Sequence, residues 1–299
     1  MAAPLQFSLA LGGGGARGFA HAGVLDVLER HGLRPAAIAG TSMGALVGAL
    51  YAAGFPPARM PDVFELLDFK GVVSITSINL GPESVLTADK FEARLREALP
   101  ASFADLRLPF ACVATDLITG ERVVMTEGDL PLAIRASMSI PVMYEPVRKD
   151  GRLLVDGGVS DPVPVEAARE LGGDPVVAVD VSSLLAAPTT AQEAAAPDGQ
   201  ERGLTSDGRP TAIQIGTRTF DVASHWLSTS QLATAAIVMT PDVGGYSIAD
   251  FVDIPAIIAE GVTTAEQSLP AVRAALSPPG PGGLRWWLAR LGLTAGSRR

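Results

Sequence analysis

Cysteine, aromatic residues and positive charge are scarce in this 299-residue chain, and each shortage excludes something. The single cysteine, Cys112, rules out an intrachain disulfide, and the apolar run around it predicts a buried thiol. Aromatic residues make up 5% of the chain, so Ala, Val and Leu must supply most of the core. The net charge of −9 leaves no broad basic surface for nucleic acid, which needs clustered lysine and arginine.

The pattern also lacks a secretory leader and a membrane span. The N-terminus has no positively charged region, and its first apolar run opens into glycines, so no signal peptide is predicted. Residues 35–58 are uncharged over a length that suits a membrane span. Glycine and proline breaks at residues 40–42 and 54–56 predict a short strand and a buried helix instead. We therefore expect a cytoplasmic location.

Strands and helices alternate along the chain, which is typical of an α/β protein with a mostly parallel sheet covered on both faces. The 47% hydrophobic content is enough for one large core, so residues 1–276 are predicted to form one domain. Apolar runs predict strands at residues 5–11, 36–39, 110–115, 122–126, 153–155 and 176–181, with weaker candidates at 212–215 and 236–239. Helical signals predict helices at residues 16–31, 43–53, 131–137, 163–171, 221–230 and 255–276.

Three segments differ from this body in composition. Residues 186–210 are rich in Ala, Pro, Thr and Gly and predict a mobile insertion. Residues 277–283 contain only Ser, Pro and Gly and predict a linker. Residues 284–299 carry four arginines, two tryptophans and no acidic residue. Such a tail favours peripheral contact with a membrane surface, although a helix packed on the body or a frayed end also fits.

A pattern between the second strand and the next helix predicts a nucleophile. Gly40-Thr41-Ser42-Met43-Gly44 fits G-x-S-x-G, the strained turn that lifts a serine hydroxyl clear of a sheet. Its glycines stand where a Cβ would clash, and the helix N-terminus points N–H groups at developing negative charge. Alone, the pattern also fits a tight turn with a helix-capping serine, so its meaning depends on its partners.

A glycine-rich loop, Gly13-Gly14-Gly15-Ala16-Arg17-Gly18, follows the first strand and opens a helix. Backbone N–H groups of such a loop can converge on an anion, which favours an oxyanion hole. The spacing also fits a dinucleotide fingerprint, but that fold needs an acidic residue where the Ser42 turn stands. A phosphate-binding loop is excluded because Phe19, and not lysine, follows Gly18. Arg17 is interpreted as a support of the loop or a ligand of lipid phosphate, or else as a surface residue.

Histidines are the usual bases for a serine nucleophile, and the chain has three. His21 lies inside the first predicted helix and His31 ends it, where packing or a helix-terminus role is more common. His225 remains the one credible partner for a Ser-His-Asp triad.

A carboxylate is the alternative base. Asp156 ends a predicted strand, and Gly157 and Gly158 after it allow a sharp turn and a close approach to a partner. Asp180 also ends a strand and is the main rival. Burial would raise the pKa of Asp156 by desolvation and make it a competent base for Ser42.

Taken in order, these motifs resemble those of patatin-like phospholipases, in particular their short bacterial members. The resemblance is carried by residues 13–18, 40–44 and 156–158, and by the segment 136–141 before the aspartate. It covers residues 5–276 and implies a three-layer α/β/α fold, a Ser–Asp dyad without a catalytic histidine, and no metal or other cofactor. By motif, it implies Ser42 as the nucleophile and Asp156 as the base. It assigns the oxyanion region to Gly13, Gly14, Gly15, Arg17 and Gly18.

The resulting hypothesis is a serine acyl hydrolase that cleaves fatty-acyl esters of phospholipids or lysophospholipids through an acyl-Ser42 intermediate. A lipid ester is then the substrate, no nucleic-acid partner is expected, and the sequence indicates no oligomeric state. The alternatives are a non-catalytic lipid- or nucleotide-binding regulatory protein, and an acyltransferase or peptidase on the same dyad. Labelling of Ser42 by a fluorophosphonate probe would separate the enzyme from the binder.

Overall fold

The computed structural model describes residues 6–68, 83–182, 212–246, 248, 251 and 253–276. The predicted insertion at 186–210, the linker at 277–283 and the basic tail at 284–299 lie outside the described residues.

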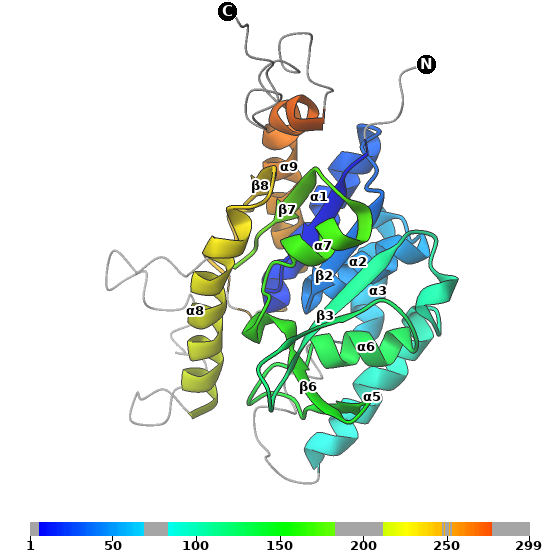
Figure 1. Cartoon of the computed structure of the whole chain (residues 1–299), viewed down its shortest axis with the longest axis vertical. Helices are drawn as coiled ribbons and strands as arrows, with labels where there is room; N and C mark the ends of the chain where they lie inside the picture. Colours follow the sequence, from blue (N-terminus) through cyan, green and yellow to red (C-terminus); the bar gives the residue numbers. More distant parts are fainter. Residues whose placement is uncertain are drawn as a thin grey trace, which may run out of the picture.

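One eight-stranded sheet forms the centre of the described structure (Figure 1). Its strands are β1 (Ser8–Leu11), β2 (Ala37–Thr41), β3 (Phe110–Asp116), β4 (Arg122–Met125), β5 (Val147–Lys149), β6 (Arg152–Asp156), β7 (Val176–Val179) and β8 (Ile237–Met239). They are ordered β5-β6-β3-β2-β1-β7-β8, with β4 paired to β3. The four pairs from β3 through β2, β1 and β7 to β8 are parallel, whereas β4 and β6 pair with β3, and β5 with β6, in antiparallel fashion.

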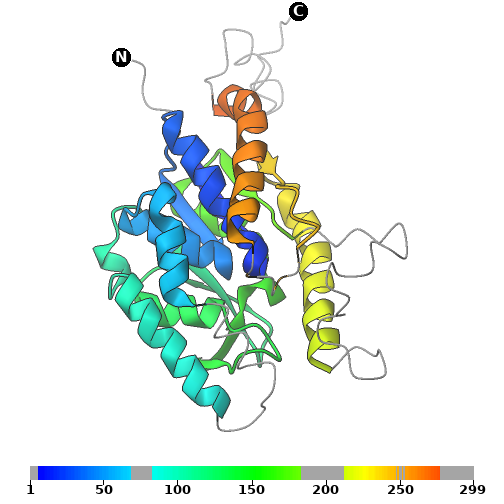
Figure 2. The ribbon, with the colours of Figure 1, turned by 180° about the vertical axis from the view of Figure 1, so that it is seen from behind.

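Helices cover both faces of this sheet, as the alternating pattern predicts (Figures 1 and 2). They are α1 (Ala20–Arg30), α2 (Met43–Ala53), α3 (Met60–Leu67), α5 (Glu83–Ala98), α6 (Leu130–Ser137), α7 (Val165–Gly172), α8 (Ala212–Leu232) and α9 (Ile254–Leu276). Short 3-10 helices, η1 (Gly15–Phe19) and η4 (Gly157–Val159), follow β1 and β6. Among the helices that the structure describes, none has both the length and the apolar character needed to cross a membrane.

Successive residues of each strand point to opposite faces of the sheet and enter two separate cores. Leu9, Leu11 and Ile38 belong to the larger core, which includes residues of α1, α2, α6 and α9. Ala10 and Ala39 belong to the smaller core, where they pack with α7. Two apolar layers of this kind make the fold a three-layer α/β/α arrangement.

The weak strand candidate at residues 212–215 is wrong, because these residues open helix α8. A four-residue apolar run does not distinguish a strand from a helix. The buried positions further along α8 are Asp221, Ser224 and Ser228, which recur at helical spacing but are polar. The sequence therefore predicts only the helical stretch at residues 221–230 and misses the beginning of α8.

The register of β3 explains why two distant motifs meet. Val113 pairs with Thr41 of β2, and the next residue, Ala114, pairs with Asp156 of β6. Strand β4 occupies the other edge of β3 over the same stretch. The carboxyl ends of β2 and β6 therefore face each other along one edge of β3, which places the residues after β2 beside the last residue of β6.

Candidate active site

Ser42 stands on a sharp turn between β2 and α2. Its backbone has φ 55° and ψ −122°, a conformation that is costly for a residue with a side chain. A Cβ at Gly44 would lie 2.3 Å from the Leu11 carbonyl oxygen, and one at Gly40 would lie 2.4 Å from the Gly44 carbonyl oxygen. The two glycines are therefore required by close backbone approach, as the elbow pattern predicts.

Asp156 lies against Ser42 at the end of β6. The Ser42 hydroxyl donates to Asp156 Oδ2 at 2.6 Å, and the Gly158 N–H donates to Asp156 Oδ1 at 2.8 Å. Both side chains are buried. A Cβ at Gly157 would lie 2.4 Å from the Val113 carbonyl oxygen, so only glycine lets the chain turn this close to β3. The structure thus brings together the serine and the Asp-Gly-Gly motif that the sequence singled out.

Burial raises the pKa of Asp156 to about 7, well above its usual range. The hydrogen bonds from Ser42 and Gly158 stabilise the ionised form and act in the opposite direction. Desolvation is the larger effect, so the carboxylate has the proton affinity that a base acting near neutral pH needs.

The segment before Asp156 holds both residues in place. The Ser137 hydroxyl accepts a hydrogen bond from the Ser42 N–H at 2.8 Å and donates to the Val113 carbonyl at 2.6 Å. Two residues later, the Ser139 carbonyl accepts from the Asp156 N–H at 2.9 Å. Neither serine was predicted as a site residue. The signal was present, since both lie in the segment 136–141 that contributes to the family resemblance.

The glycine loop lines one side of a small, mostly enclosed cavity next to Ser42. The cavity is lined by Gly13, Gly14, Gly15, Arg17, Ser42, Ile140, Asp156, Gly158, Pro162, Ser182, Phe220, Asp221, Ser224 and Ile248. Gly18 is not among these residues, and a Cβ on it would strike Met43 of α2. Gly18 therefore allows the close packing of η1 on α2.

The amide groups of the loop are not equivalent. The Gly13 N–H already donates to the Pro162 carbonyl oxygen at 2.9 Å. Within the described part of the chain, no acceptor is found for the N–H groups of Gly14 and Gly15. His21 supports the loop from behind, since its Nε2 lies 2.8 Å from the Gly12 carbonyl oxygen.

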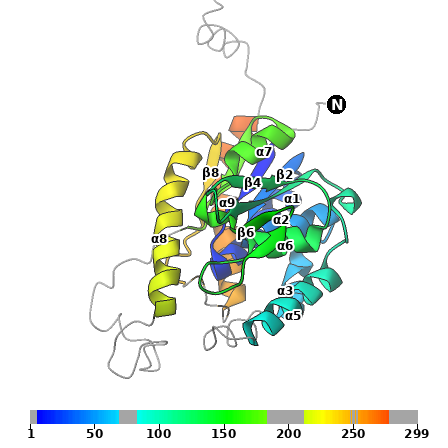
Figure 3. The ribbon, with the colours of Figure 1, turned by 60° about the horizontal axis from the view of Figure 1, so that its bottom comes forward.

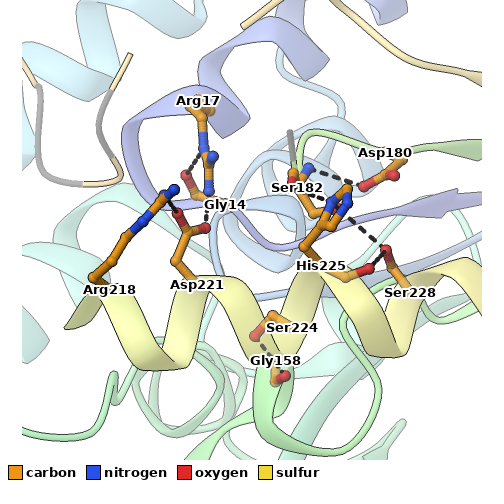
Figure 4. A network of polar contacts seen from close by, with 10 residues as sticks. All are labelled: Gly14, Arg17, Gly158, Asp180, Ser182, Arg218, Asp221, Ser224, His225 and Ser228. Carbon is orange, nitrogen blue, oxygen red and sulfur yellow. Dashed lines mark hydrogen bonds and ion pairs between the residues drawn. The ribbon is translucent and has the colours of Figure 1, made fainter. Parts of the chain in front are cut away.

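Arg17 is buried, so its interpretation as a surface residue is wrong. Its guanidinium forms an ion pair with Asp221 of α8, and Arg218 approaches the same carboxylate at 2.9 Å (Figure 4). On the next turn of the helix, the Ser224 hydroxyl donates to the Gly158 carbonyl at 2.8 Å. Helix α8 is thereby tied to both the glycine loop and the Asp-Gly-Gly turn, and it forms a wall of the cavity.

The rival bases are engaged elsewhere. His225 Nδ1 lies 2.7 Å from the Ser182 carbonyl oxygen, and the Asp180 carboxylate accepts from the Ser182 N–H at 2.9 Å (Figure 4). Burial lowers the pKa of His21 to about 4, so this histidine is neutral at pH 7. His31 is exposed at the end of α1. Within the described residues, no group of three or more His, Cys, Asp or Glu side chains is placed to hold a metal ion.

The sheet and the serine turn between β2 and α2 define the class: an α/β protein with a nucleophile-elbow pattern. Residues 9–169 match the family model described as patatin-like phospholipase, which is more than half of the chain. The chain belongs to the patatin-like phospholipase family.

Three curated proteins to which this chain is similar are named for the NTE family or for a phospholipase. An uncharacterized NTE family protein of Mycobacterium tuberculosis is 34% identical over 236 residues, which cover 78% of this chain and 57% of the relative. Patatin-like phospholipase domain-containing protein 6 of Homo sapiens is 35% identical over 193 residues, 59% of this chain and 13% of that protein. A lysophospholipase of Mycosarcoma maydis is 34% identical over 187 residues, 60% of this chain and 10% of that protein. The chain therefore spans little more than half of the mycobacterial relative and a small part of the other two.

Among solved structures, VipD from Legionella pneumophila aligns with a TM-score of 0.47 and 14% identity, covering 89% of this chain and 66% of that one.

Proposed function

We propose that this protein is a serine acyl hydrolase that cleaves fatty-acyl esters of phospholipids or lysophospholipids. The observation that carries the proposal is the 2.6 Å hydrogen bond from the Ser42 hydroxyl to the buried Asp156 carboxylate. A serine next to a base, on a strained turn beside a cavity, is the arrangement that acyl transfer requires. Membership in the patatin-like family and the name of the lysophospholipase relative support a lipid ester as the substrate.

In the first half-reaction, the Ser42 Oγ attacks the acyl carbonyl carbon while its proton moves to Asp156 Oδ2. The carbonyl oxygen becomes an oxyanion, which needs donors aimed at it. The N–H groups of Gly14 and Gly15 are the best candidates, since the Gly13 N–H is occupied by Pro162. Collapse of the tetrahedral intermediate releases the alcohol, which takes the proton from Asp156.

In the second half-reaction, Asp156 accepts a proton from water, and the resulting hydroxide attacks the acyl-Ser42 ester. The fatty acid leaves, and the proton returns from Asp156 to the Ser42 oxygen. One carboxylate thus serves as base and then as acid in each half, which a pKa near neutrality permits. Hydrolysis of a p-nitrophenyl ester series of increasing acyl length tests the activity and measures the length of chain that the cavity accepts.

The rate is expected to follow the ionisation of Asp156. Because the base is active when deprotonated and its pKa is raised to about 7, kcat/KM should rise with pH through that value. We expect kcat/KM to be about 100-fold lower at pH 5 than on the plateau above pH 8. The measurement is titrimetric release of fatty acid from pH 4 to 9. A profile that stays flat down to pH 5 would contradict Asp156 as the base.

Ser137 is proposed to position the nucleophile through its hydrogen bond to the Ser42 N–H. Ser137→Ala should lower kcat by about 10- to 100-fold with little change in KM. The substitution removes the hydrogen bond that holds the Ser42 backbone and leaves the groups that bind substrate unchanged.

Ser139→Ala is the matched control for this prediction. The Ser139 hydroxyl contacts Arg135, and only its backbone carbonyl holds Asp156. This variant removes a buried hydroxyl from the same segment and should keep kcat within about threefold. Equal losses of kcat in both variants would show a general packing effect and remove the positioning role of Ser137.

A further inference from the structure

Helix α8 has two faces of different character. The inner face carries Phe220, Asp221 and Ser224, which line the cavity. The outer face consists of the exposed residues whose side chains are described: Ala212, Ile215, Thr219, Ala223, Trp226, Thr229 and Ser230. None of these seven carries a charge, in a chain whose net charge is −9. Asp221 lines the cavity and pairs with Arg218, whose side chain is 41% exposed.

Two large apolar side chains stand on this outer face. Ile215 is 54% exposed and Trp226 is 68% exposed. Eleven residues correspond to three helical turns plus about 20°, so the two side chains lie on the same side, about 16 Å apart along the axis. Helix α8 runs along the left edge of the molecule in Figures 1 and 3, and no other described helix or strand lies beyond it there.

The apolar surface continues from α8 toward the cavity. A Cβ at Gly216 would lie 2.9 Å from Val142 Cγ2, so half-exposed Val142 packs against α8 at the residue after Ile215. Ile140, two residues before Val142, lines the cavity. Val159, also half exposed, follows Gly158, whose carbonyl accepts from Ser224 of α8. Val142 and Val159 are thus exposed apolar residues on the loops that adjoin both α8 and the cavity.

We infer that the outer face of α8, with Ile215 and Trp226 as its anchors, docks on a lipid surface and brings the cavity to its substrate. A face without charges loses little solvation in the headgroup region, and a tryptophan side chain suits that depth. Exposed apolar side chains grouped beside a cavity mark an interaction surface. The proposed substrate resides in such a surface, so this inference rests on the proposed function for the identity of the partner.

The outer face of α8 and the predicted basic tail should differ in the lipids that they bind. Four arginines in residues 284–299 would favour anionic lipid and weaken with salt. An uncharged face should bind zwitterionic vesicles and retain binding at about 1 M salt. Phosphatidylcholine vesicles are therefore the probe.

The experiment is co-sedimentation with phosphatidylcholine vesicles, using the full chain with Ser42→Ala so that binding is measured without turnover. Adding Trp226→Glu or Ile215→Glu should each weaken partitioning by at least about tenfold, which is about 1.4 kcal/mol. The matched control is Leu66→Glu, which places the same charge at a 47% exposed leucine of α3, away from α8 (Figures 1 and 3). The control should partition like its parent.

A second readout leaves α8 intact. With Trp286→Phe and Trp287→Phe, Trp226 is the only tryptophan, and its emission should shift to the blue and be quenched by brominated lipid in these vesicles. Unchanged emission, or equal partitioning of the α8 variants and their parent, overturns the inference. A dimer in light scattering that Trp226→Glu dissociates would also overturn the inference, since a second copy of the chain would then cover this face.

With Ser42 intact, Trp226→Glu should still cleave a short soluble ester at the parent rate. Loss of ester cleavage in the parent itself would refute the proposed function and leave the binding result standing.

Discussion

Ser42→Ala is expected to abolish ester hydrolysis, lowering kcat by on the order of 10⁴-fold or more. The substitution removes the attacking oxygen, and neither the oxyanion donors nor Asp156 can replace it. The fold should persist, because alanine removes one hydroxyl and keeps the Cβ on the turn. The measurement is p-nitrophenyl ester hydrolysis, with thermal unfolding to show that the variant is folded.

Ser8→Ala is the matched control for the loss of a buried serine hydroxyl. Ser8 is buried in β1, and its hydroxyl donates to the Gly173 carbonyl at 2.7 Å. It begins β1 and pairs with Ala37 at the start of β2, whereas Ser42 follows the other end of β2. This variant should lose some stability and keep its activity. Residual activity of Ser42→Ala above about 1% of the parent would exclude Ser42 as the nucleophile.

Asp156→Asn is expected to have two opposite effects: loss of activity and gain of stability. Asparagine cannot take the proton from Ser42, so kcat should fall by about 10³- to 10⁴-fold. In the parent, burial raises the pKa of Asp156 to about 7, so ionisation of this group opposes folding. Its stabilising contribution is present below the unfolded pKa near 4 and is lost as pH rises toward 7.

The neutral amide removes this cost. A shift of about three pKa units sets an upper limit of about 4 kcal/mol, and an amide N–H group without an acceptor offsets part of it. We therefore expect Asp156→Asn to be more stable than the parent by about 1 to 3 kcal/mol at pH 8, with a smaller difference at pH 5. Denaturant unfolding at both pH values measures it.

Asp161→Asn separates this prediction from a general effect of buried carboxylates. Asp161 is also buried and its pKa is also raised, to about 6, but its side chain pairs with Arg122 and does not touch Ser42. This variant should keep kcat within about threefold of the parent and leave the midpoint of the pH profile unchanged. If Asp156→Asn remains active while Ser42→Ala is inactive, the dyad is wrong and His225 becomes the candidate base.

The sequence predicts most of the sheet and both motifs of the site, because a strand, a glycine break and a helix form patterns that are recognisable within twenty residues. That the two motifs meet depends on the antiparallel pairing of β6 with β3, which places Asp156 directly beyond the end of β2. The family resemblance adds the role of Asp156 as the base, because motif spacing alone does not decide between Asp156, His225 and Asp180.

What the sequence does not reveal depends on contacts between distant segments. The Gly13 N–H cannot be excluded as an oxyanion donor until Pro162 is seen to accept from it. Only residues 221–230 of helix α8 are predicted to be helical, and the position of this helix depends on the Arg17–Asp221 pair and on Ser224. Ser137 acts on Ser42 from 95 residues away, through a hydroxyl that any buried serine could carry.

Labelling with a fluorophosphonate, followed by mapping of the modified residue by mass spectrometry, tests directly whether Ser42 is the nucleophile and Asp156 its base. We expect one phosphonyl adduct, on Ser42 of the native chain, formed at a rate that falls steeply in Asp156→Asn, and no adduct after unfolding. Ser8→Ala and Asp161→Asn should be labelled like the parent. An adduct on another residue, or native protein that stays unlabelled while hydrolysing esters, would contradict a Ser42–Asp156 acyl hydrolase.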